Sequence, residues 1–332
     1  KDVFDRFVFA FPSTLPVDQG VTYDYYFEVF DNDAPHGFKS SKSSVFSNRI
    51  QTDQEIENEV LQQQNDNINS LQKSLKAQDK QMSEMEKLQK LGKEKESLDF
   101  KDQQKVNEFL KRQEQQDALM KEFAKKLDKN LEEFKTDKKD EFKEELQKRL
   151  DKVDKDLEKN QKLLDELKQL NDKIQQEELF EKMDRFKQSA KNQAKSLEQL
   201  VELTKRFYVE KKAEQIAEKL SQLAGKQDKL ADDKENNAQR QDEINKEFND
   251  IREELKELDK QNKELKSPMD LPKNEDQQKS VDQDLKKASE ELEQQNKAGA
   301  KPKQKSAAKK MMQMGSSMAQ SMAGDQKEQM EE

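Results

Sequence analysis

The chain has 332 residues, of which 30% are hydrophobic and 41% charged, so it carries too few apolar side chains for one large globular core. Its 63 basic and 72 acidic residues are interleaved and give a net charge of −9, which argues against a dedicated nucleic-acid binder. The sequence has no cysteine, which excludes disulfides and thiolate metal sites, and no run of about 18 apolar residues that would span a membrane.

Residues 1–50 differ from the rest and indicate β-structure. Three apolar or alternating stretches predict strands: residues 3–11, 21–31 and 43–50. The spacing of Leu15, Gly20 and Tyr23 resembles the tyrosine corner of immunoglobulin-like folds. About 50 residues are too few for a whole sandwich, so we expect a partial β-sandwich made of its final strands. The chain also lacks an initiating methionine and a signal peptide, and we expect it to be a fragment of a longer protein.

Residues 52–266 carry apolar side chains every three or four positions, and Thr52 or Asp53 is expected to cap the first helix. We expect a coiled-coil region with breaks near 92, 138 and 175. Its clearest repeat runs from Ala213 to Leu265 as one helix, although residues 232–242 are polar even at the repeat positions and are expected to bend or fray. The apolar seam of this helix contains Ile216, Leu220, Leu223, Leu230, Ile244, Phe248, Ile251, Leu255 and Leu258.

The predicted fold class is therefore mainly α, with long coiled-coil helices or helical hairpins after the truncated sandwich. Two arrangements would cover the apolar seam. The helices fold back on one another as antiparallel hairpins, or they form an extended rod that pairs with a second copy of the chain. The expected breaks between helices favour the hairpins.

After residue 266 the pattern changes. We expect a proline-containing link at 267–273, a short helix at 274–298, a basic linker at 299–305 and a Met-rich helix and tail at 306–332. A row of methionines is either a flexible docking face for a partner or, as we favour, a seam covered by another helix of the chain: Met311, Met314, Met318 and Met322.

The same region contains a block of lysines that is either a contact for an anionic surface or a solvated linker, and the second reading is favoured. The lysines are Lys301, Lys303, Lys305, Lys309 and Lys310.

Motifs for catalysis or cofactor binding are weak. The Gly-Lys pairs at Gly92 and Gly225 lack the preceding glycine and the following Ser or Thr of a phosphate-binding loop. The acidic loop Asp31–Asp33 suits either calcium or an ordinary turn, and the turn is favoured. His36 is the single histidine, so a His-based triad cannot be built. We predict no enzyme activity, no cofactor and no metal.

Several segments taken together resemble an uncharacterised family of large bacterial envelope proteins that carry a domain of unknown function. They are Tyr23–Asp33, Lys39–Ser43, Leu197–Leu203, Leu220–Gln227, Phe248–Ile251 and Ala307–Met314. The resemblance implies transmembrane helices and immunoglobulin-like domains upstream, followed by a long coiled coil on the periplasmic side of the inner membrane. Membrane attachment is then expected only through upstream segments. The family has no established activity, so the resemblance assigns no residue roles.

These observations predict a non-enzymatic structural or interaction scaffold in the cell envelope. Its expected partners are other helices of the same chain, a second copy, or other envelope proteins, and the sequence indicates no small-molecule substrate. One alternative is a cytoplasmic coiled coil of the chromosome-maintenance type that works beside an ATPase head. The other is a module that binds anionic surfaces through the lysine block.

Overall fold

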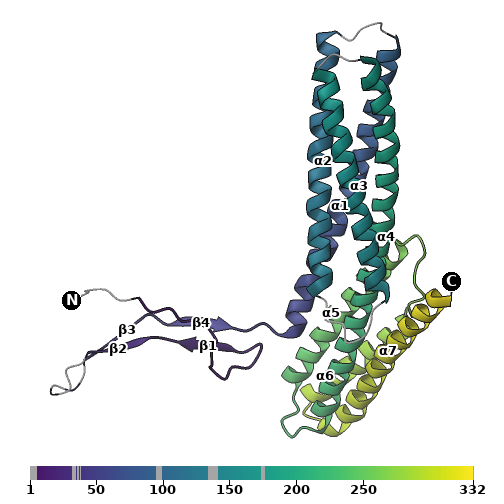
Figure 1. Cartoon of the computed structure of the whole chain (residues 1–332). Helices are drawn as coiled ribbons and strands as arrows, with labels where there is room; N and C mark the ends of the chain where they lie inside the picture. The colour runs from purple at the N-terminus through teal and green to yellow at the C-terminus, as the bar shows by residue number, and fades with distance from the viewer. Residues whose placement is uncertain are drawn as a thin grey trace. The chain divides into compact units, whose positions relative to one another are not determined.

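The computed structural model describes residues 6–31, 35, 37, 39–94, 99–133, 141–172 and 176–331. This part of the chain is mainly helical, with four short strands followed by seven helices (Figure 1). The strands are β1 (Thr22–Tyr25), β2 (Glu28–Phe30), β3 (Ser40–Lys42) and β4 (Phe46–Arg49). The helices are α1 (Asp53–Glu94), α2 (Phe100–Glu133), α3 (Glu141–Asp172), α4 (Gln176–Asp232), α5 (Ala238–Lys263), α6 (Glu275–Glu293) and α7 (Lys297–Glu331). Two compact units divide after Gln62.

The first unit contains the strands, which form two small antiparallel sheets. β1 pairs with β4, so that Tyr23 lies opposite Asn48, and β2 pairs with β3. Because side chains alternate along a strand, one face of the ribbon is aromatic and the other polar. The aromatic face gathers Phe7, Phe9, Phe11, Tyr25, Phe27 and Phe46. On the polar face Ser47 Oγ donates to Asp24 Oδ1 at 2.5 Å.

The strand predictions are met only in part. The expected strand at 21–31 is present as β1 and β2, and the one at 43–50 as β4. Of the stretch 3–11, residues 6–11 are described and are not a strand, because their aromatic rings pack on the ribbon while their backbone joins neither sheet. β3 was not anticipated, since its serines and lysine give no apolar alternation.

The start of α1 completes the first unit and follows the expected capping pattern. Glu55 N donates to Thr52 Oγ1 at 3.2 Å, and Thr52 N donates to Glu55 Oε2 at 2.9 Å. This reciprocal arrangement is a capping box, which satisfies two backbone donors that the first turn leaves open. Thr52 therefore caps the helix.

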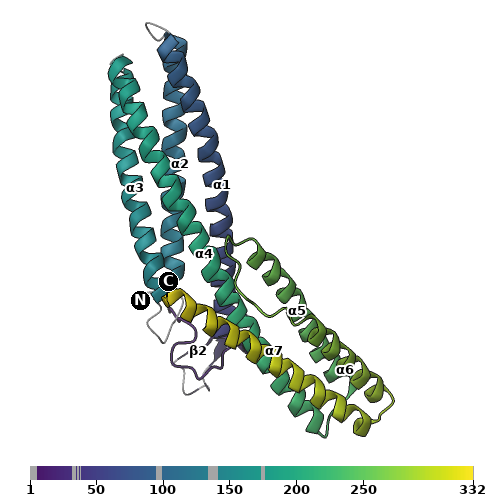
Figure 2. The same ribbon diagram turned by 90° about the vertical axis from the view of Figure 1, so that its right-hand side faces the viewer.

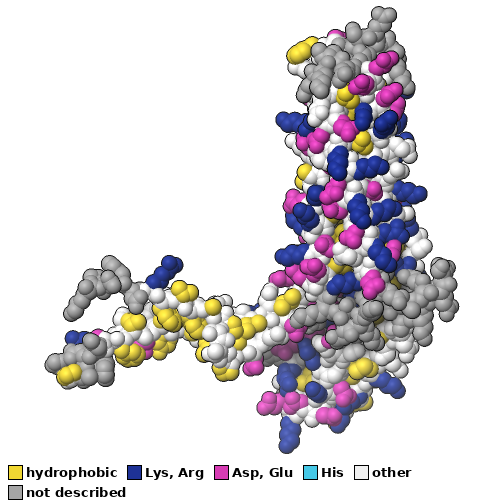
Figure 3. Space-filling model, in the orientation of Figure 1, with side chains coloured by type: hydrophobic (Ala, Val, Ile, Leu, Met, Phe, Trp, Pro, Cys, Tyr) yellow, Lys and Arg dark blue, Asp and Glu magenta, His cyan; other side chains and the backbone are white. Residues whose placement is uncertain are grey.

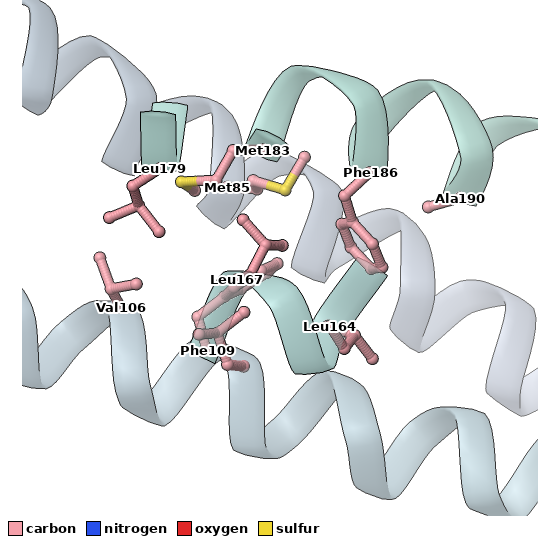
Figure 4. Close-up of a cluster of buried hydrophobic side chains, with 10 residues drawn as sticks. Met85, Val106, Phe109, Leu164, Leu167, Leu179, Met183, Phe186 and Ala190 are labelled. Atoms are coloured by element: carbon pink, nitrogen blue, oxygen red, sulfur yellow. The ribbon is translucent and has the colours of Figure 1, made fainter. Parts of the chain in front are cut away.

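In the second unit, the remainder of α1 joins α2, α3 and the first half of α4 in an antiparallel four-helix bundle, here called the first bundle (Figure 2). Polar contacts link neighbouring helices around it, such as Gln116 Nε2 to Ser74 O at 3.0 Å and Lys187 to Glu86 at 2.9 Å. Its core includes a cluster of ten side chains from the four helices (Figure 4): Met85, Val106, Phe109, Leu110, Leu164, Leu167, Leu179, Met183, Phe186 and Ala190.

The second half of α4 forms a second bundle with α5, α6 and α7. The four helices run alternately up and down, and contacts join each one to the next around the ring: Lys219 to Glu254 at 2.8 Å, Arg252 to Asp282 at 3.6 Å, Lys310 to Asp284 at 2.6 Å and Lys305 to Asp228 at 2.8 Å. α4 thus supplies one wall of each bundle and continues between them without a break.

The expected single helix from Ala213 to Leu265 is wrong, because the chain reverses within it. α4 ends at Asp232 and α5 begins at Ala238, after Asn237 accepts a hydrogen bond from Arg240 N at 2.9 Å. The polar residues at 232–242 were expected to bend the helix. Without apolar contacts to extend it, and with an Asn cap available, the segment turns back fully, so α4 and α5 pack as a hairpin.

The break expected near 92 lies close to the end of α1. Gly92 lies inside α1, which continues to Glu94. The breaks near 138 and 175 lie outside the described residues. Pro268 and Pro272 lie in the connection between α5 and α6, as expected.

The prediction of a basic linker at 299–305 is wrong, because these residues belong to α7, which contains Pro302. Asn296 Oδ1 accepts from Gly299 N at 3.0 Å near the start of the helix. Ala300, Gln304 and Ala307 are fully buried against the second bundle. This packing outweighs the backbone hydrogen bond lost at one proline close to a helix start.

Candidate functional site

The nine residues of the predicted apolar seam all lie in the core of the second bundle. Leu220 and Phe248 are fully buried, and Leu255, the most exposed of the nine, is 8% exposed. Residues up to Leu230 lie on α4 and those from Ile244 onward lie on α5. The two parts of the seam therefore face each other across the hairpin within this chain.

The methionine row does not form an open docking face. Met311, Met314, Met318 and Met322 are buried on α7, the most exposed at 5%. α7 approaches α4 so closely that a Cβ atom added to Gly315 would lie 2.8 Å from Ala217 O and 2.9 Å from Ser221 Oγ. The favoured expectation, that the methionines are covered by another helix of the same chain, matches this arrangement.

The lysine block is helical, and three of its five members are paired with acids of the same chain. Lys301 lies 2.8 Å from Asp232, Lys305 contacts Asp228 and Asp232, and Lys310 contacts Asp284. Hydrogen bonds from Lys301 and Lys305 lower the pKa of Asp232 to about 2. Contact with an anionic surface would have to compete with these pairs for three of the five charges. Lys303 and Lys309 also lie on α7.

The remaining motif residues show no site. Gly225 lies inside α4, where its Gly-Lys pair is ordinary helix. Of the acidic loop only Asp31 is described, and its carboxylate accepts from Lys39 N at 3.0 Å across the ribbon. Asn32, Asp33 and His36 lie outside the described residues. In the described ranges no group of three or more His, Asp or Glu side chains is placed to hold a metal ion.

A shallow groove of about 360 Å³ lies where α3 and α4 meet the chain that follows α5. Its charges are already engaged within the chain. Arg149 Nε pairs with Glu145 at 2.8 Å, while Lys266 Nζ pairs with Glu198 at 2.7 Å. Because the groove is lined by charges of both signs that are already paired, it does not favour an anionic or a cationic ligand.

The second bundle contains a buried layer of amide side chains, which we call the Gln241 layer: Gln227, Asn236, Gln241 and Gln304. Gln227 and Gln241 donate to each other at 3.0 and 2.8 Å. Gln304 donates to Gln241 at 2.7 Å and exchanges hydrogen bonds with Asn236 at 2.8 and 3.1 Å. Every side-chain nitrogen and oxygen in the layer has a partner, so the network costs no unpaired buried group.

The first bundle contains a second polar layer, the Gln193 layer, with side chains from all four helices: Gln78, Gln113, Asp117, Asn160 and Gln193. Gln193 is its hub. The Oε1 atom of Gln193 accepts from Gln78 Nε2 at 3.2 Å and from Asn160 Nδ2. Gln113 Nε2 donates to Asp117 Oδ1 at 3.1 Å. All five side chains are at most 3% exposed.

In the Gln193 layer each amide nitrogen has at least one acceptor, but several oxygens have no donor. Within the described residues, four buried oxygens have no partner: Gln78 Oε1, Gln113 Oε1, Asp117 Oδ2 and Asn160 Oδ1. Burial raises the pKa of Asp117 to about 6, against hydrogen bonds from Gln113 and Gln193, which lower it. A buried carboxylate without a cation nearby is an expensive group, so this layer is the best candidate for a functional site in the molecule.

Comparisons with known proteins add no family to these observations. No family model, no curated protein and no solved structure matches the chain. In the part of the chain that the structure describes, no helix is both long and apolar enough to cross a bilayer.

Sequence reasoning missed the Gln193 layer. Its members occupy core positions of their helices, where a polar residue reads as a gap in the apolar repeat. Five such gaps on four helices do not predict a common layer until the register of the helices in the bundle is known. The available signal was the recurrence of Gln and Asn, instead of Lys or Glu, at these inward positions.

Proposed function

We propose that this chain is a non-enzymatic helical scaffold, in which two antiparallel bundles are joined end to end to hold attached segments at a fixed spacing. The observation that carries the proposal is α4, whose 57 residues run through both bundles. At about 1.5 Å per residue this helix is roughly 85 Å long. A helix packed along its length resists bending where two bundles joined by a loop would not.

Within this proposal the helices pair as antiparallel coiled coils inside one chain. The support is that the predicted apolar seam and the methionine row are both covered by helices of the same chain. A second copy is then unnecessary for burying them. Light scattering should report a monomer across a hundredfold range of concentration, and circular dichroism should report mainly helix. A concentration-dependent dimer with the same helix content would favour the extended two-chain rod.

The strand unit is proposed to be the end of an immunoglobulin-like sandwich. Tyr23 Oη accepts a hydrogen bond from Asp18 N at 2.9 Å, five residues upstream, as in a tyrosine corner. The aromatic face of the ribbon is also only half covered, with Phe7 78% and Phe46 43% exposed (Figure 3). A peptide of residues 1–50 should therefore fold only when further strands are supplied. Independent folding of that peptide would reject the assignment.

The resemblance to bacterial envelope proteins supports a location outside the cytoplasm. Fusing a reporter enzyme that is active only in the periplasm to the C-terminus of the full-length protein tests this location. The periplasmic reporter is expected to be active in this fusion. A cytoplasmic reporter that is active at the same junction would instead favour the cytoplasmic alternative.

A further inference from the structure

The Gln193 layer leaves buried oxygens unpaired, which the scaffold role does not explain. Each amide nitrogen in it has an acceptor, including Gln193 Nε2, which lies 3.8 Å from Met120 Sδ. Four oxygens are nevertheless left without a donor. The amide N–H groups are directed elsewhere, and the carboxylate oxygen Asp117 Oδ2 is among the four oxygens that they leave unpaired.

The groups that meet in the layer are uncharged on every helix apart from Asp117 itself. Gln78 comes from α1, Asn160 from α3 and Gln193 from α4, while Gln113 lies one turn before Asp117 on α2. No charged side chain among the described residues contributes to the pKa shift of Asp117. An ionised Asp117 is thus a buried negative charge with hydrogen bonds from amides and no cation among the described groups that shift its pKa, whereas a protonated Asp117 gains an O–H donor.

We propose that the Gln193 layer is a proton-operated device, in which protonation of Asp117 removes a buried charge and adds one O–H donor to the layer, and loss of the proton admits water between the helices. Water can supply further donors when the carboxyl group is ionised, and a polar layer of this size has partners for it. The first bundle is then tight in acid and looser above neutrality, while the second bundle, whose amide layer is complete, is insensitive to this change.

The sign of the effect follows from linkage. The folded-state pKa of about 6 lies above the ordinary value of 3.8, so protons favour the folded bundle. The resulting stabilisation is complete below pH 3.8 and is lost as the pH rises through about 6. Between pH 5 and pH 8 the unfolding equilibrium constant should rise by about tenfold. This window lies above the range in which the acids with lowered pKa, such as Asp232 and Glu254, titrate.

The experiment compares urea unfolding of the chain at pH 5 and pH 8 with that of Asp117→Asn, which keeps the shape and removes the titration. The variant should lose the roughly tenfold change, and Asp151→Asn, at an exposed position of the same bundle, should keep it. Subtracting the two profiles cancels every contribution that does not come from Asp117. A full pH response in Asp117→Asn overturns the proposal.

Two further readouts keep the test decisive if Asp117→Asn does not fold. Gln113→Leu removes an N–H donor from the carboxylate, so the midpoint of the pH response should move upward, and an unmoved midpoint overturns the proposal. Hydrogen exchange, corrected for its intrinsic pH dependence, should lose protection in α2 and the first half of α4 as the pH rises, and keep it in α5 and α6. Equal loss in both bundles also overturns it.

Discussion

The two bundles each bury a layer of polar side chains, but only one of them completes its hydrogen bonds. In the second bundle, Gln227 and Gln241 pair reciprocally, and Gln304 ties them to the turn before α5. In the first bundle, the layer contains the carboxyl group of Asp117, and four of the layer's oxygens lack donors. A complete layer fixes how helices align at little cost, whereas an incomplete one makes stability depend on solvent and protons. The comparison therefore separates a structural layer from a responsive one.

Breaking the complete layer should have the largest effect. Gln241→Leu removes hydrogen bonds to Gln227, Gln304 and Asn245 at once and leaves both buried polar atoms of Gln227 without a partner. We expect a loss of about 2–4 kcal/mol in the free energy of unfolding, measured by urea titration. If the loss is below about 1 kcal/mol, the Gln241 layer does not fix the alignment of the helices in the second bundle.

The close contact between α4 and α7 gives the second bundle its tight packing, and Gly315→Ala tests it. The added methyl would meet Ala217 O at 2.8 Å, which is backbone and cannot move aside alone. We expect a loss of about 1–3 kcal/mol by thermal or urea unfolding. The matched control is Gly225→Ala on α4, where nothing lies within 4 Å of the new methyl. That change should stabilise the chain by about 1 kcal/mol through helix propensity.

The half-buried ion pairs of Glu254 should contribute less. Burial raises the pKa of Glu254, but hydrogen bonds from Lys212 and Lys219 outweigh it and hold the pKa below the ordinary 4.5. The stabilisation is present above pH 4.5 and is lost as the pH falls through the folded-state pKa. Glu254→Gln should lose about 1–2 kcal/mol at pH 7, and the gap from the unmodified chain should narrow toward pH 3. A gap that stays constant with pH would contradict this assignment.

The smallest effect is expected for Gln78→Leu in the incomplete layer. The substitution removes an unpartnered oxygen together with a donor, and Gln193 Oε1 keeps its hydrogen bond from Asn160. We expect a change within about 1 kcal/mol by urea unfolding, in contrast to the chemically identical change at Gln241. Equal losses at the two positions would remove the distinction between the layers.

The sequence predicted which side chains are buried better than it predicted what covers them. The period of apolar residues placed Leu220 and Phe248 inside, because burial on one helix face follows from spacing alone. The apolar period did not reveal that these residues face each other, since the spacing on one helix does not indicate which other helix covers it. Pro302 suggested a linker by local rules, and only tertiary packing around Ala300 and Gln304 explains the helix there.

The shared helix α4 also fixes the rotation of one bundle relative to the other about the helix axis. Each residue of a helix turns its side chain by about 100°, so one residue inserted between the halves of α4 would twist the second bundle by that angle about the first. Seven inserted residues make almost two full turns and would return it nearly to its starting direction, about 10 Å further along. Segments attached to the far ends of the two bundles are therefore held at a fixed angle to each other as well as at a fixed distance.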